Sequence, residues 1–203
     1  LYAAVGQYPA YTGTGVQIGV ATIDLCNDGL AHFTDLTSLA KPSGSMCNDI
    51  AAPAWGNGDI YVTDYLGNQL IKESGQNTAN PTYSVVIASC SGCNGIEWLA
   101  DGTLLVSQLG YFGQTPSPGY YKFNPATSTG VMVSGTSGLA GDGIIFDASR
   151  TTLYSVVGGN TVDALQSFDG WASAVQVGVS TDADCGGASP ATASVLVNST
   201  MYI

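Results

Sequence analysis

The protein is a chain of 203 residues in which four Lys and Arg residues stand against fifteen Asp and Glu residues, giving a formal net charge of −11 at pH 7. So few cations argue against binding to a nucleic-acid backbone or to an anionic membrane surface. Disorder is not expected, because 45% of the residues are apolar. No apolar run approaches the roughly 18–20 residues that cross a bilayer, so no membrane insertion is expected.

Short apolar runs rich in Val, Ile, Tyr and Thr alternate with Gly, Asn, Asp and Ser turns, and no stretch of helical period exceeds about two turns. Five pairs of apolar residues are each predicted to begin a strand. In chain order, they are Leu1-Tyr2, Ile60-Tyr61, Leu104-Leu105, Leu153-Tyr154 and Met201-Tyr202. Similar strands are predicted upstream of the last four pairs, at 48–51, 94–97, 142–145 and, more loosely, 191–194. Further strands are predicted after the pairs, for example at 119–123 and 130–133.

This pattern repeats. The second members of the later pairs, from Tyr61 to Tyr202, are 44 to 49 residues apart. Four short antiparallel strands in a repeat of this length are typical of a β-propeller blade. We therefore predict one all-β propeller domain over 1–203, with an insertion at 7–13 and a two-sheet sandwich as the alternative. The predicted blades are 1–47 (partial), 48–90, 94–138, 142–185 and 190–203 (partial).

About four blades' worth of sequence is present, and a sheet ring that does not close leaves unpaired edges. We expect residues beyond both ends, or a partner, to complete the ring.

A polar residue begins the repeated strand each time, at Asn48, Asn94 and Asp142. The first strand of each propeller blade lines the central channel, so equivalent positions converge near one mouth of that channel. Two amide oxygens and a carboxylate at one point suit a hard divalent cation. The alternative is that Asn and Asp only suit the turn that enters each strand.

The segments Asn48-Asp49, Asn94-Gly95-Ile96-Glu97-Trp98 and Asp142-Gly143-Ile144 resemble those of the gluconolactonase/regucalcin-like (senescence-marker-protein) family. The resemblance implies a six-bladed propeller with one divalent metal, commonly Ca²⁺, over the channel. It implies that Asn94 and Asp142 are metal ligands, that Asn48 is a ligand or a substrate contact, and that Asp142 is also the general base. The family adds a Glu ligand from a blade further upstream. Its substrate-binding Arg is replaced here, since Met46 and Cys47 precede Asn48.

The predicted activity is metal-assisted hydrolysis of a lactone, ester or phosphoester, in which a cation polarises the substrate and a carboxylate accepts a proton. No competing catalytic set is evident, because His32 is the single histidine and is interpreted as structural. One alternative is a non-catalytic propeller that binds a protein partner or belongs to a larger assembly. Another is a condensing or lyase-type enzyme on the same fold.

The five cysteines, together with low Lys content and a sequon at Asn198-Ser199-Thr200, predict a secreted protein or one in an organelle lumen. Cys90-Ser91-Gly92-Cys93 has the spacing of a redox motif but lacks the βαβ context of one. A structural disulfide is therefore favoured over a metal site or a redox-active pair, and its connectivity is left open. The odd count leaves one cysteine over, and Cys26 is our candidate for it.

Overall fold

A computed structural model describes residues 1–6, 18–25, 29–41, 44–53, 58–75, 78, 80–110, 117–158, 161–181, 195–197 and 200–202. Five predicted features lie outside the described residues, namely the insertion at 7–13, Cys26, Cys185, the strand at 191–194 and the first two residues of the sequon, Asn198 and Ser199. The chain divides into two compact units, Leu1–Cys93 and Asn94–Ile203. Each unit is described by itself.

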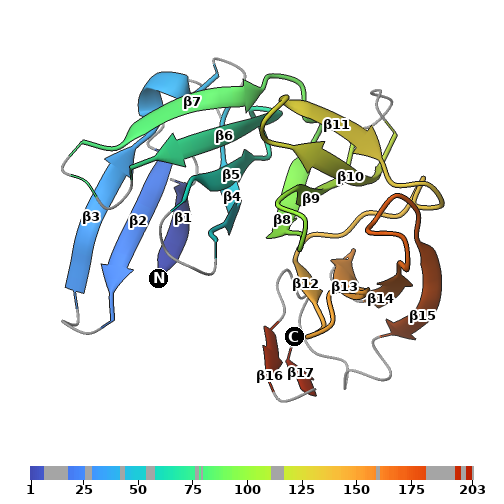
Figure 1. The fold of residues 1–203 in the computed structure, drawn as a ribbon. Helices are drawn as coiled ribbons and strands as arrows, with labels where there is room; N and C mark the ends of the chain where they lie inside the picture. Colours follow the sequence, from blue (N-terminus) through green and yellow to red (C-terminus); the bar gives the residue numbers. More distant parts are fainter. Residues whose placement is uncertain are drawn as a thin grey trace. The chain divides into compact units, whose positions relative to one another are not determined.

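The first unit contains two antiparallel sheets (Figure 1). The first sheet comprises β1 (Tyr2–Gly6), β2 (Ile18–Asp24) and β3 (Gly29–Asp35). A short 3-10 helix, η2 (Thr37–Leu39), follows it. The second sheet comprises β4 (Cys47–Ala51), β5 (Ile60–Asp64), β6 (Gln69–Ser74) and β7 (Thr82–Ile87).

The second unit contains two four-stranded sheets and a hairpin. One sheet comprises β8 (Cys93–Trp98), β9 (Leu104–Gln108), β10 (Gly119–Asn124) and β11 (Thr129–Met132), and its first residue is the last of the first unit. The other comprises β12 (Ile144–Phe146), β13 (Thr152–Val157), β14 (Thr161–Gln166) and β15 (Val175–Thr181). The hairpin comprises β16 (Val195–Val197) and β17 (Thr200–Tyr202).

Each four-stranded sheet is a meander in which strands that follow one another in the chain are neighbours. This is the arrangement of a propeller blade, and the predicted all-β propeller fold is confirmed. Among the described residues the only helical segment is η2, and no helix there is long and apolar enough to cross a membrane.

The core of the first unit lies between its two sheets. Apolar side chains of alternate residues on β2, such as Ile18 and Val20, are fully buried against Ile60, Val62 and Ile71 of the second sheet. This period of two is what a strand with one face on the core requires.

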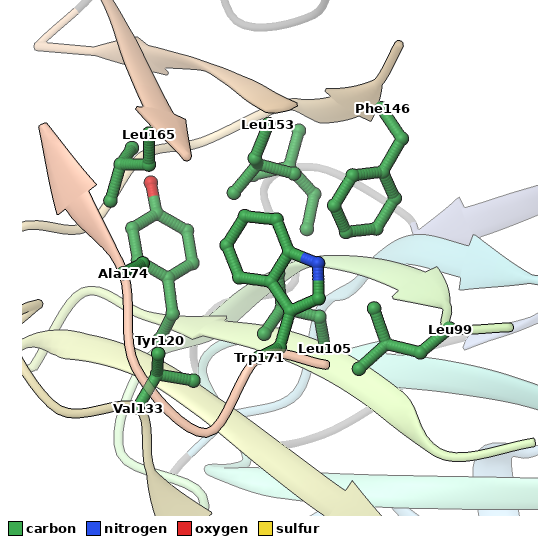
Figure 2. Packing of buried hydrophobic residues seen from close by; sticks show 10 residues of the cluster. Leu99, Leu105, Tyr120, Val133, Phe146, Leu153, Leu165, Trp171 and Ala174 are labelled. Atoms are coloured by element: carbon green, nitrogen blue, oxygen red, sulfur yellow. The ribbon is translucent and has the colours of Figure 1, made fainter. Parts of the chain in front are cut away.

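The core of the second unit is a cluster contributed by its two four-stranded sheets and the segments that follow them (Figure 2). The indole of Trp171 lies at its centre, with its ring 5.1 Å from that of Phe146 in an edge-to-face arrangement. Its Nε1–H donates a hydrogen bond to the carbonyl of Arg150 at 3.0 Å, so the buried polar atom is satisfied. Fully burying a side chain such as Leu105 or Leu153 contributes about 1.5–3 kcal/mol.

The three described cysteines, Cys47, Cys90 and Cys93, are buried and carry free thiols. A disulfide in this chain therefore stays a prediction.

Candidate functional site

Two of the three predicted ligands, Asn94 and Asp142, lie close together in the second unit. Asn94 is the second residue of β8 and only 3% exposed, whereas Asp142 is half-buried in the bend before β12. The strand predicted at 142–145 thus begins two residues later than expected, because the Gly141-Asp142-Gly143 sequence favours a bend. The Asp142 N–H nevertheless donates to the carbonyl of Val156 at 2.7 Å, which ties its backbone to β13.

The side chains of Asn94 and Asp142 form a hydrogen bond, with the Asn94 amide donating to the carboxylate. Burial raises the pKa of Asp142 above its ordinary value, and the hydrogen bond from Asn94 opposes this shift. A carboxyl group with a raised pKa beside a polar amide has the properties of a general base or of a cation ligand.

Gly95 permits the close approach of the two segments. A Cβ at this position would lie 2.6 Å from the carbonyl oxygen of Asp142 and 2.9 Å from Cγ1 of Ile144. Any larger residue would push β8 away from Asp142, so the glycine of the Asn94-Gly95 pair has a steric role.

The residue that precedes Asp142 is held by a buried hydroxyl. Ser107 Oγ, on β9, donates to the carbonyl of Gly141 at 2.7 Å and accepts from its N–H at 3.1 Å. A Cβ on Gly141 would lie 1.9 Å from Ser155 Oγ, which itself accepts a hydrogen bond from the Tyr120 hydroxyl at 2.5 Å. These buried hydroxyls fix the backbone on which Asp142 depends.

The sequence reasoning missed Ser107, Tyr120, Gly141 and Ser155. Their signal in the sequence is weak, since Ser107 and Ser155 only interrupt apolar runs, and it is the structure that shows both to be fully buried. A buried hydroxyl needs a partner, which points to a structural hydrogen bond at each position.

Asn48, the third predicted ligand, lies in the first unit as the second residue of β4. The register of β4 against β5 shifts between Cys47 and Ile50, so Asn48 lies in a bulge. Thr63 Oγ1 accepts from the N–H of Asp49 at 3.0 Å and steadies this bulge. The contribution of Asn48 to a shared cation site stays a prediction.

The donor chemistry of Asn94 and Asp142 suits a hard cation such as Ca²⁺, which prefers carboxylate and amide oxygens. Two side chains are fewer than the six to eight ligands that Ca²⁺ takes, so other oxygens must complete its shell. Within the described ranges, no three His, Cys, Asp or Glu residues gather as a metal site.

No protein-family model matches the sequence, and no curated protein matches it either. Several solved structures share its fold. A protein of unknown function from Bacteroides caccae is 15% identical, with a TM-score of 0.55 over 97% of this chain and 62% of its own. A “putative 6-phosphogluconolactonase” from Bacteroides fragilis is also 15% identical, with a TM-score of 0.54 over 89% of this chain and 53% of its own.

TolB from Acinetobacter baumannii is a third similar structure, 15% identical with a TM-score of 0.53 over 87% of this chain and 41% of its own. Identities this low establish the fold alone. The chain spans less than two thirds of the length of each of these three structures.

Proposed function

We propose that this propeller is a metal-dependent hydrolase of a lactone, ester or phosphoester, with Asp142 as its general base. The observation that carries the proposal is the pairing of a half-buried Asp142 with the buried amide of Asn94. The fold supports it, since two similar structures, from Bacteroides fragilis and Bacteroides uniformis, bear the name “putative 6-phosphogluconolactonase”. We further propose a secreted or lumenal location, from the cysteine content and the low Lys content.

In this proposal Asp142 accepts the proton of the attacking water, and burial favours its uptake by raising the pKa of the carboxylate. Asn94 orients that carboxylate through its hydrogen bond, and its amide oxygen would be one of the oxygens that hold a bound cation. A bound divalent cation, of which Ca²⁺ is our candidate, would supply polarisation of the carbonyl or phosphoryl oxygen. The Ser107–Gly141 hydrogen bonds keep the backbone of Asp142 from moving during the reaction.

The test is hydrolysis of lactones, aryl esters and phosphotriesters by the full-length protein, with and without a chelator. Asp142→Asn is expected to lower kcat/KM by about 10²–10⁴-fold, the usual contribution of a general base. Asp163→Asn is the matched control, because burial also raises the pKa of Asp163, which lies on β14 of the sheet that follows Asp142. Equal activity in the Asp142 variant and the wild type would refute the proposed base.

A second candidate is a non-catalytic propeller that binds a protein partner. It is favoured by Val175, Val177 and Val179 of the edge strand β15, which are 60%, 53% and 55% exposed. Exposed apolar residues in a row on a sheet edge are typical of a binding surface. Binding of Ca²⁺ without turnover of any substrate in the panel would favour this second candidate.

A further inference from the structure

The connection between β7 and β8 carries two cysteines in one tight turn, Cys90-Ser91-Gly92-Cys93. The Cys93 N–H donates to the carbonyl of Cys90 at 3.1 Å, which closes the turn. Gly92 has a φ of +58°, a left-handed conformation that glycine adopts without strain. In such a turn the first and fourth Cα atoms lie within about 7 Å. Disulfides span Cα distances of about 4.4–6.8 Å, so the turn brings the two cysteines into bonding range.

Asn68 holds this turn from the neighbouring β5–β6 connection. Its carbonyl accepts from the Cys90 N–H at 2.8 Å, and its side-chain Oδ1 accepts from the Gly92 N–H at 2.8 Å. Asn68 itself has a φ of +52°, which Asn tolerates better than most residues. The turn is therefore bound at two points, and its geometry does not depend on a bond between the sulfur atoms.

Both thiols face the protein interior and each other. Cys90 and Cys93 are 0% exposed, and their side chains are hydrogen-bonded. The Cys93 thiol also donates to the carbonyl of Gln69 at 3.1 Å. Burial raises the pKa of the Cys93 thiol well above its ordinary value, so little reactive thiolate forms in the folded chain.

The third described cysteine lies outside this turn. Cys47 is on β4, where its cross-strand partner is Asp64. Burial, with a smaller effect of the Asp64 charge, raises its pKa to about 12. Cys47 therefore serves as an internal reference, because it is also buried but is not held in the same turn.

We propose that Cys90 and Cys93 form a disulfide when the chain folds in an oxidising environment, and that this disulfide then resists reduction.

The oxidant is a low-molecular-weight disulfide such as glutathione disulfide. The thiolate of one cysteine attacks a glutathione sulfur and releases one glutathione; the other cysteine then attacks the mixed disulfide and releases the second. Two thiols lose two protons and two electrons, and one glutathione disulfide becomes two glutathione molecules. Because both thiols are fully buried in the folded chain, the bond forms before the core closes.

The first experiment maps the bond. The full chain is refolded from its reduced, unfolded state with excess glutathione disulfide, alkylated under denaturing conditions, digested and examined by mass spectrometry. We expect the peptide with Cys90 and Cys93 to lack two hydrogens and to carry no alkyl group. Cys47→Ser should leave this bond intact, while Cys90→Ser or Cys93→Ser should abolish it. Alkylation of both Cys90 and Cys93 in the refolded wild type, or pairing of either with another cysteine, would overturn the proposal.

The second experiment measures the effect of the bond on thermal unfolding. Closing a loop of four residues should raise the midpoint of unfolding by about 4–8 °C over the reduced chain. The oxidised folded protein should also resist dithiothreitol unless a denaturant is added. Rapid reduction of the folded protein would contradict the protected location of the bond, even if the mapping succeeds. Neither result depends on the proposed hydrolase activity.

Discussion

At the scale of single residues, Glu73 has the least ordinary environment in the first unit. Its side chain is fully buried on β6, and Thr34 Oγ1 donates to Oε1 at 2.8 Å. Its second oxygen, Oε2, has no hydrogen-bond partner among the described residues. Burial raises the pKa of Glu73, while the Thr34 hydrogen bond and the nearby His32 partly oppose the shift. His32, predicted to be structural, thus lies beside a buried carboxyl group.

Since the pKa of Glu73 is raised on folding, its ionisation destabilises the native state. The penalty is absent below its ordinary pKa, develops as the pH rises through the raised value, and is full above it. Glu73→Gln should therefore raise the midpoint of thermal unfolding at pH 7 by about 2–4 °C, with little effect at pH 4. Asp35→Asn is a control for which the opposite change is expected. Hydrogen bonds from Thr37 lower the pKa of Asp35, so its ionisation stabilises the native state and the substitution should lower the midpoint at pH 7. A less stable Glu73 variant at pH 7 would refute this explanation.

The role of Asp142 depends on neighbours that its own identity does not reveal. The repeat predicted it as a cation ligand and the family resemblance implied a general base, while the structure places its carboxylate against Asn94. The buried hydroxyl of Ser107 was not anticipated, because a serine in a strand is common and only its burial shows that it must bond to Gly141.

At the scale of elements, the approach of β8 to the bend before β12 depends on Gly95. Gly95→Ala should destabilise the protein by about 1–3 kcal/mol, the usual cost of overpacking, because the added methyl collides with the Asp142 carbonyl. It should also weaken any activity that depends on Asp142. Urea unfolding monitored by tryptophan fluorescence would measure the loss of stability.

Gly130→Ala is the matched control for that experiment. Gly130 also lies in a strand, β11, but an added Cβ would meet its nearest atoms only at 3.9 and 4.0 Å. This substitution should change the free energy of unfolding by less than about 0.5 kcal/mol. If both variants lose the same stability, a general cost of replacing strand glycines explains the result, and the close approach does not.

At the scale of the whole molecule, the net charge of −11 opposes compaction, since like charges repel one another. Two ion pairs are found among the described residues, Lys72–Asp59 and Lys122–Asp101. Screening by sodium chloride should therefore stabilise the fold more than it weakens these pairs.

We expect the midpoint of thermal unfolding at pH 7 to rise as sodium chloride is increased from about 0.01 M, where the Debye length is about 30 Å, to about 0.5 M. The rise should shrink as the pH approaches the sequence isoelectric point of about 4.1. A midpoint that falls with salt at pH 7 would show that attractive pairs outweigh repulsion in this chain.

By itself the sequence determined the fold class and the positions of many strands. The apolar pairs Ile60-Tyr61 and Leu104-Leu105 begin β5 and β9, as predicted. Every residue of these two strands is buried, and a strand buried on both faces favours consecutive apolar residues. The polar residues Asn94 and Asp142 were predicted as equivalent positions from the same repeat, because each comes at or just before the repeated strand.

Only the tertiary structure decided which side chains meet. Three sets of contacts join residues 22 to 48 positions apart: the hydrogen bond between Asn94 and Asp142, the Ser107 contact with Gly141 and the hydrogen bonds of Asn68 to the Cys90 turn. Local pattern carries no record of such contacts, because they depend on how two strands or turns approach and on which polar atoms are buried together. Composition and the period of apolar residues thus determine the strands and sheets. The contacts between residues that are distant in the sequence determine which polar groups can act together.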